Sequence, residues 1–126
     1  VVLPRIKNDF LQLLIATAAQ KLHEITIETD SRSAAAVVAV SGGYPGDFDK
    51  GKPIQGLDEA PLDNSLVFQA GTMQQGNEVV TNGGRVLTIT SFGNDFQEAI
   101  KKSYQNIGKL HFDKMYFRKD IGRDLL

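Results

Sequence analysis

The chain has 126 residues, which is enough for one domain around one main hydrophobic core. Apolar residues make up 41% and charged residues 23%, a balance typical of globular proteins that excludes a disordered chain. The net charge of −1 gives no sign of a nucleic-acid or membrane partner, and the lack of cysteine excludes disulfides and thiolate metal sites. No run approaches about eighteen apolar residues, so we expect a soluble cytoplasmic protein.

The first predicted element is a helix from Pro4 to Leu22. Pro4 suits the first helical turn, because the N–H that proline lacks would have no helical partner there. The apolar residues form two adjacent stripes: Ile6, Phe10, Leu13, Leu14 and Thr17, and Leu3, Leu11, Ile15, Ala18 and Leu22. Two stripes predict burial on most sides. We therefore expect this helix to pack partly on a body that is missing here, and the chain to begin inside a larger polypeptide.

The connection that follows carries strand and turn signals. Residues 25–27 alternate and predict a short strand or connector, and a polar break at 30–33 suggests a domain boundary. The small apolar run at 34–40 predicts a central strand buried on both faces. Turn residues at 41–46 end that strand, and they specify backbone geometry rather than chemistry.

The next segment is irregular. Pro53 has no amide to donate, so the residues around it could pair only at the edge of a sheet. Residues 58–64 are acidic and contain a proline, and they predict a loop that leads to the strands beyond it.

Residues 66–91 carry the clearest pattern of the chain. Three β-rich runs are separated by turn signals at 75–77 and 82–84. Asn-Gly between alternating runs is a strong hairpin signal, because a type I′ turn needs positive φ at both central residues. These runs predict a three-strand antiparallel meander.

Arg85 directly follows the second of these turns. It shares a parity with Leu87 and Ile89, because side chains alternate faces along a strand. A guanidinium at the mouth of an apolar face, beside a Gly-rich turn with free amides, suits an anionic oxygen. The alternative is an exposed arginine beside a turn, and the pattern alone leaves both open.

The C-terminal third predicts a second helix and a tail. Asn94 with Gln97 three residues later resembles a capping box, apolar residues then recur at helical spacing, and Gly108 is placed to end the helix. We interpret residues 110–122 as a final strand and a tether.

Familiar catalytic and metal-binding patterns are missing, so we predict no catalytic and no metal-binding residue. His23 is interpreted as a solvated residue late in the helix, and His111 as a strand residue. No Gly-x-Ser-x-Gly, Walker or dinucleotide fingerprint occurs. Scattered loop carboxylates are interpreted as solvated, and most phenylalanines as core. The carboxylates are Asp47, Asp49, Asp58, Glu59 and Asp63.

Four segments, taken together, resemble one known family. They are Val1–Arg5, Gly43–Ile54, Thr81–Leu87 and Tyr116–Gly122, in that order along the chain. The second carries Gly-Tyr-Pro-Gly and a later Lys-Gly, the third reads Thr-Asn-Gly-Gly-Arg-Val-Leu, and the last reads Tyr-Phe-Arg-Lys-Asp-Ile-Gly. All four are similar to segments of the phosphoribosylamine–glycine ligases, also called glycinamide ribonucleotide synthetases.

The resemblance implies a C-terminal fragment of such an enzyme with an α+β fold. Residues 1–29 would be the last helix and connector of the ATP-grasp region. Residues 30–126 would be the C-terminal domain. That domain is expected to be a small antiparallel β domain of the rudimentary barrel-sandwich (single-hybrid-like) type with one packed helix.

The family uses ATP and Mg²⁺ (or Mn²⁺) to join glycine to 5-phosphoribosylamine through glycyl phosphate, giving glycinamide ribonucleotide in de novo purine biosynthesis. Expected partners are these small molecules and the remaining ATP-grasp and N-terminal domains of the same polypeptide, not nucleic acid or membrane. By this resemblance, the family's magnesium ligands and nucleotide-binding loops would lie before Val1. We therefore expect no ATP or metal on this fragment, and no ligase activity from it alone.

The resemblance also assigns a role in substrate positioning, with Arg85 as the ligand of the ribosylamine 5-phosphate. The expected substrate-binding residues are Arg85, Gly84, Gly83, Asn82, Tyr44 and Gly46. A guanidinium fork matches phosphate oxygens in a way that a lysine does not. Arg118 and Asp120 are interpreted as an ion pair that ties down the tail.

Two other classes are kept as alternatives. One is the C-terminal domain of another ATP-grasp enzyme, of the carboxylase or carboxyaminoimidazole ribonucleotide synthase type. The turn at 82–85 and the tail at 118–122 argue against it. The other is a non-catalytic carrier or interaction module, which would need a modifiable lysine at a hairpin tip, and neither turn has one.

Overall fold

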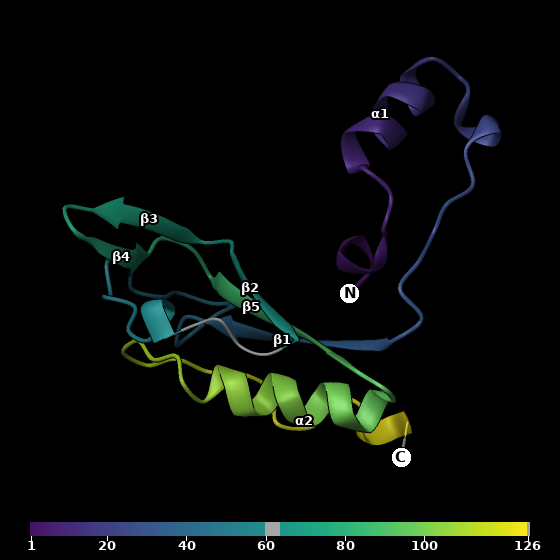
Figure 1. Cartoon of the computed structure of the whole chain (residues 1–126). Helices are drawn as coiled ribbons and strands as arrows, with labels where there is room; N and C mark the ends of the chain where they lie inside the picture. The colour runs from purple at the N-terminus through teal and green to yellow at the C-terminus, as the bar shows by residue number, and fades with distance from the viewer. Residues whose placement is uncertain (60–63, 126) are drawn as a thin grey trace. The chain divides into compact units, whose positions relative to one another are not determined.

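The computed structural model describes residues 1–59 and 64–125, which form two compact units, Val1–Arg32 and Ser33–Leu126 (Figure 1). The predicted acidic loop at 58–64 falls largely on residues 60–63, outside the described part of the chain, and Asp63 lies there too. Residues Leu57–Glu59 before it form a short 3-10 turn. Within the described ranges, no helix is long and apolar enough to cross a membrane.

The N-terminal unit contains one short helix, α1 (Phe10–Ala18), between 3-10 turns at Leu3–Arg5 and Leu22–Glu24. The predicted continuous helix from Pro4 to Leu22 is therefore wrong. Asn8 bonds through its side chain to the backbone of Thr26 and Glu28, and Asp9 accepts from the amides of Leu11 and Gln12 as the N-cap of α1. Such side chains offer the backbone an alternative to helix, so the chain is extended before α1 begins.

The ends of this unit lie side by side as an extended pair. Ile6 and Thr29 form an isolated antiparallel bridge, and the segment at 25–27 is a connector without a strand. Asp30 secures the exit, because its carboxylate accepts from the guanidinium of Arg32 at 2.7 Å and its carbonyl accepts from Arg5. The bonds from the side chain and amide of Arg32 lower the pKa of Asp30.

Helix α1 buries only part of its apolar surface. Leu13 and Ala16 are buried. Four apolar side chains, two from each predicted stripe, are 47–64% exposed: Phe10 and Leu14 from the first stripe, and Leu11 and Ile15 from the second.

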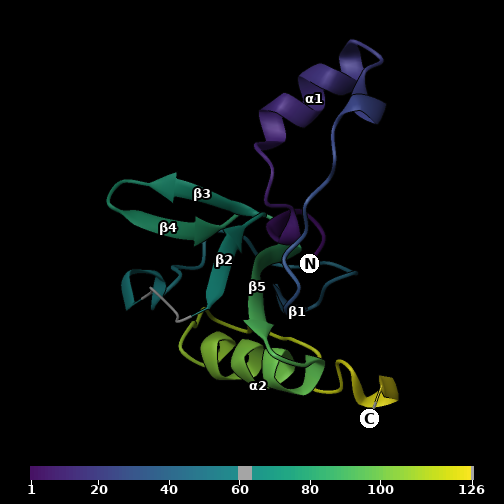
Figure 2. The same cartoon turned by 45° about the vertical axis from the view of Figure 1, so that its right-hand side comes forward.

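The C-terminal unit is built on two small antiparallel sheets. Strands β1 (Ser33–Val40), β5 (Arg85–Gly93) and β2 (Ser65–Gln69) form one sheet in the order β1-β5-β2, and β3 (Thr72–Gln75) pairs with β4 (Glu78–Thr81) in the other. Helix α2 (Phe96–Ile107) runs along one face of the three-stranded sheet in both views (Figures 1 and 2). The core between them comprises Val37, Ala39, Val86, Leu87, Ile89, Ile107, Leu110 and Phe112.

Two strand predictions are corrected by this topology. The first strand is an edge strand rather than a central one, and Val38 on its outer face is 36% exposed. The predicted three-strand meander is also wrong, since Gln75 to Glu78 makes a true hairpin but β4 does not pair with β5. The first of the three predicted strands is in fact two strands, β2 and β3. The chain leaves one sheet at Ala70 and Gly71 and enters the other.

The edge prediction at Pro53 is confirmed. Pro53 forms an isolated antiparallel bridge with Val80, and the amide of Ile54 donates to the carbonyl of Val79. This segment therefore lies along the free edge of β4, where a missing amide costs no ladder bond.

The predicted helix is confirmed as α2, with its N-cap one residue later than expected, at Asp95. Asp95 accepts from the amide of Glu98 at 2.8 Å, and the Glu98 carboxylate accepts from the amide of Asn94 at 2.7 Å. Gly108 is the C-cap. The tail makes isolated bridges, at His111 with Gln55 and at Tyr116 with Val40, so the predicted final strand is wrong.

Candidate functional site

The two glycine-rich loops singled out in the sequence pack against each other. Ser41, directly after β1, donates its amide to the carbonyl of Gly84 at 2.8 Å and its hydroxyl to the carbonyl of Gly83 at 2.9 Å. The ring of Tyr44 covers Gly84 so closely that a Cβ at that position would lie 2.1 Å from a ring carbon. The Gly83–Gly84 turn thus fits its neighbour only as glycine, and the two loops form one structural unit.

The turn at 82–84 is a corner between sheets, not a hairpin turn. The backbones of Gly71 and Gly83 touch, since a Cβ on Gly71 would lie 2.7 Å from the Cα of Gly83. The amide of Asn82 donates to the carbonyl of Gly71, and the amide of Gly71 donates to the carbonyl of Arg85. This crossing leads the chain out of β4 and places Arg85 at the first position of β5.

A β-bulge then decides the face on which Arg85 lies. Ala39 pairs with Leu87 but Val40 pairs with Arg85, which leaves Val86 as an extra residue on β5. Val86 and Leu87 are both fully buried. The predicted parity of Arg85 with Leu87 and Ile89 is therefore wrong, because a bulge reverses the alternation beyond it.

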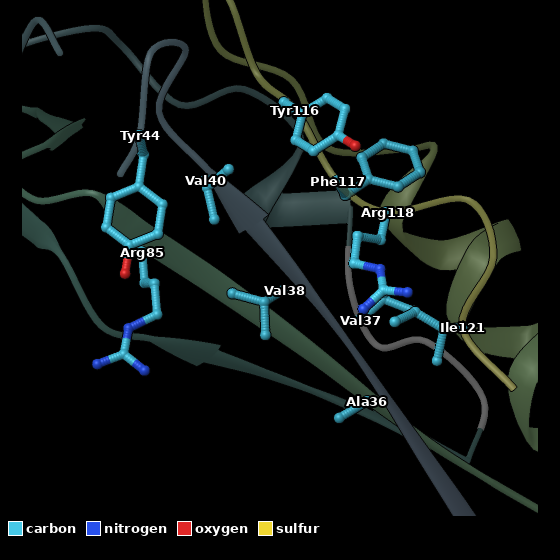
Figure 3. Close-up of a pocket in the computed structure, with 10 residues that line it drawn as sticks. All are labelled: Ala36, Val37, Val38, Val40, Tyr44, Arg85, Tyr116, Phe117, Arg118 and Ile121. Carbon is cyan, nitrogen blue, oxygen red and sulfur yellow. The ribbon is translucent and has the colours of Figure 1, made fainter. Parts of the chain in front are cut away.

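Arg85 borders two neighbouring cavities, and Val38 and Tyr44 line both of them as well. The smaller has a volume of about 220 Å³, and its lining is apolar apart from Arg85, Arg118 and the tyrosine hydroxyls. The larger is open, has a volume of about 490 Å³, and adds Ala70, Gly84 and Thr88 to its walls. In Figure 3 the guanidinium of Arg85 points away from Val38 and the other valines.

The guanidinium of Arg85 is exposed and makes no hydrogen bond or ion pair within the described ranges 1–59 and 64–125. The carbonyls of Gly83 and Gly84 accept from Ser41, while their amides donate to no acceptor within those same ranges. An unpaired guanidinium beside free amides can bind an anionic oxygen bidentately. The larger cavity is therefore a candidate anion site.

Arg118 lies at the far side of the smaller cavity and is already paired. Its Nε and Nη2 donate to the two carboxylate oxygens of Asp120 at 2.9 and 2.8 Å, which raises the pKa of Arg118 and lowers that of Asp120. The hydroxyl of Tyr104 donates to the carbonyl of Arg118 and accepts from the amide of Ile121. The predicted ion pair of the tail is confirmed.

The other predicted site residues differ in their placement. Gly84 and Tyr44 line the larger cavity with Arg85, whereas Gly83 and Asn82 belong to the same corner but line neither cavity. Gly46 lines neither cavity. The sequence did not point to Ser41, Val38 or Thr88 as part of the site. Two adjacent apolar residues at 86–87 interrupt the alternation of a strand. That pair is the one signal in the sequence that could have indicated the bulge, which places Arg85 on the same face as Val38 and Thr88.

The acidic and histidine side chains of this chain do not form a metal centre in the part of the chain that the structure describes, where no group of three or more could hold an ion. His23 is exposed and lies 4.0 Å from Glu24. The described residues therefore do not offer the set of carboxylate ligands that Mg²⁺ bound with ATP would need.

Comparison with known families identifies this arrangement as a domain that occurs in purine-biosynthetic ligases. Residues 34–124 match the family described as "Phosphoribosylglycinamide synthetase, C domain", and the chain belongs to that family.

The similar proteins are named as phosphoribosylamine–glycine ligases or as a bifunctional purine biosynthetic protein. The chain is similar to a phosphoribosylamine–glycine ligase of Vibrio cholerae, with 42% identity over 96% of this chain and 28% of that protein. It is 38% identical to a bifunctional purine biosynthetic protein of Schizosaccharomyces pombe, over 99% of this chain and 16% of that protein. The crystal structure of phosphoribosylamine–glycine ligase from Thermotoga maritima aligns with a TM-score of 0.68 and 32% identity over 85% of this chain and 27% of that one. The chain thus spans less than a third of these relatives.

Proposed function

We propose that this chain is part of an ATP-dependent ligase that joins glycine to 5-phosphoribosylamine and forms glycinamide ribonucleotide in purine biosynthesis. Family membership and the names of the relatives support the assignment. ATP and Mg²⁺ (or Mn²⁺) would act in the parts of the enzyme outside this chain, and the cytoplasm is the expected location. The chain alone is expected to have no ligase activity, since its described residues include no group that could hold the Mg²⁺ ion on which phosphoryl transfer depends.

The proposed division of the chain follows from the same assignment. Residues 1–29 would be the last helix and connector of the ATP-grasp region, and residues 30–126 the C-terminal domain of barrel-sandwich type. The exposed stripes of α1, with Leu11 and Ile15 on one and Phe10 and Leu14 on the other, support this role. Apolar surface of this kind is normally buried against another part of the protein. The remaining ATP-grasp and N-terminal domains would supply it.

We assign to this domain the binding of the 5-phosphate of the ribosylamine. The observation that carries the assignment is the unpaired guanidinium of Arg85 at the wall of an open cavity that Gly84 also lines, directly after the amides of Gly83 and Gly84 in the chain. The guanidinium and the amides would donate to different phosphate oxygens. Tyr44 and Ser41 would hold the turn in place, while Asn82 and Gly46 would act through the backbone of their loops.

The experiment is a kinetic comparison in the complete enzyme that contains this domain. Arg85→Ala should lower kcat/KM for 5-phosphoribosylamine. The loss should correspond to about 1.5–3 kcal/mol of transition-state stabilisation, the scale of a hydrogen bond to a charged group. The KM for ATP and glycine should stay unchanged. Arg85→Lys should recover only part of the loss, because an ammonium lacks the planar fork. Arg123→Ala serves as the matched control, since Arg123 is exposed and lines neither cavity. Unchanged kinetics for the ribosylamine in Arg85→Ala would overturn the assignment.

A further inference from the structure

The apolar cavity beside Arg85 is not explained by a ribosylamine, glycine or phosphate. Its floor comes from the outer face of β1, with Val38 and Val40, and its opposite wall from the tail, with Tyr116 and Phe117. A sugar hydroxyl or an ammonium placed there would lose its hydrogen bonds to water and find few partners. The group that fits this cavity is therefore apolar or aromatic.

The volume of the apolar cavity limits the size of the chemical group that it can hold. About 220 Å³ is below the roughly 300–1,000 Å³ of pockets that enclose a whole drug-sized ligand. The cavity therefore suits one ring system, with the rest of the molecule outside it. Tyr116 is 59% exposed at the rim, so its ring can stack on the face of a planar group.

The charges around the cavity fix where an anionic end would lie. Arg118 at one side is held by both oxygens of Asp120. Arg85 at the other side has no partner in the described ranges, and its guanidinium is directed away from the valines (Figure 3). Val38 and Tyr44 line both cavities. A ligand whose ring lies between Tyr116 and the valines would therefore extend past Val38 and Tyr44 and place its anionic group at Arg85.

We propose that this pair of cavities binds a nucleoside 5′-monophosphate, with the phosphate on Arg85 and the base in the apolar cavity against Tyr116. The inference rests on the proposed function, since a nucleotide shares the ribose 5-phosphate of the proposed substrate and adds a planar base at C1′. Nucleotides of this class would then compete with 5-phosphoribosylamine for the site.

The test is a calorimetric or NMR titration of the 126-residue chain with three probes: ribose 5-phosphate, adenosine and adenosine 5′-monophosphate. We expect the monophosphate to bind about tenfold or more tighter than ribose 5-phosphate, the size of one base–aromatic stacking contact. Tyr116→Ala should remove this advantage and leave ribose 5-phosphate binding unchanged. Tyr116→Phe, which keeps the ring, should behave as the wild type. The backbone bridge of Tyr116 to Val40 does not depend on the side chain, so both variants should fold.

The possible outcomes separate the two proposals. Equal affinity for ribose 5-phosphate and the monophosphate, or an advantage that survives Tyr116→Ala, overturns the nucleotide site and leaves the phosphate assignment standing. Ribose 5-phosphate binding that is the same in wild type and Arg85→Ala overturns the phosphate assignment instead. An affinity for adenosine 5′-monophosphate that is the same in Arg85→Ala as in the wild type overturns the nucleotide site, since the phosphate would then bind elsewhere.

Discussion

The ring of Tyr44 lies directly on the Cα of Gly84, with no room for a Cβ between them. Gly84→Ala should therefore displace the ring and destabilise the chain by about 1–3 kcal/mol, the usual range for overpacking. Chemical denaturation of wild type and variant measures the difference. Tyr44→Ala combined with Gly84→Ala should recover most of the loss, because the clash needs both side chains. Strict additivity of the two changes would show that the ring and the turn are not in contact.

Ser41 is expected to matter for anion binding more than for stability. Its hydroxyl holds the carbonyl of Gly83, so Ser41→Ala should weaken ribose 5-phosphate binding several-fold at a stability cost of about 1 kcal/mol. The matched control is Ser103→Ala, because Ser103 makes a similar bond to the carbonyl of Ala35 and neither residue lines a cavity beside Arg85. Calorimetry and denaturation on both variants give the comparison. Equal effects of the two substitutions on binding would contradict a positioning role for Ser41.

Tyr104 should act as the anchor of the tail. Tyr104→Phe removes the bonds of the hydroxyl to the carbonyl of Arg118 and the amide of Ile121, and should cost about 1 kcal/mol for each net bond lost. Hydrogen exchange at the amide of Ile121 should accelerate, while the amides of β5 keep their protection. Uniform acceleration across the C-terminal unit would mean that the tail is not a separately anchored segment.

The pairing of Asp30 with Arg32 should give the N-terminal unit an acid-sensitive step. The folded-state pKa of Asp30 is below its unfolded value of about 3.9, because Arg32 donates to its carboxylate. The stability from this pair is then fully present above that unfolded value and is lost as the pH falls through the folded-state pKa. NMR titration of the Asp30 carboxyl carbon tests the direction. Asp30→Asn should remove this contribution to the pH dependence, and a midpoint at or above 3.9 would contradict the expectation.

Much of the site could be predicted from local turn chemistry. Asn82, Gly83 and Gly84 indicated a turn before a strand, although that turn is a corner between sheets and not the predicted hairpin, and the place of Arg85 after it followed from chain order alone. The face of the sheet on which the Arg85 side chain lies could not be predicted in this way. Counting alternate residues along a strand assumes that no residue is inserted, and Val86 is an inserted bulge residue. The bulge depends on how β5 meets β1, which is a long-range pairing.

The topology was less predictable than the elements. The apolar run at 34–40 has the composition of a buried central strand, but which strands flank it is a property of the whole sheet, and it pairs with β5 alone in that sheet. The same limit applies to the corner where the backbones of Gly71 and Gly83 touch, because two glycines from different turns must meet there. The early break of the first helix had a local signal in Asn8 and Asp9, which favour caps over helix interiors.

The central claim is that Arg85 and the turn before it bind a ribose 5-phosphate, and the most direct measurement is an amide NMR titration of this chain with ribose 5-phosphate. We predict saturable shifts centred on the amides of Gly83, Gly84 and Arg85, abolished by Arg85→Ala and retained in the control Arg123→Ala. Shifts centred elsewhere, or shifts of the same size in Arg85→Ala, would contradict the claim.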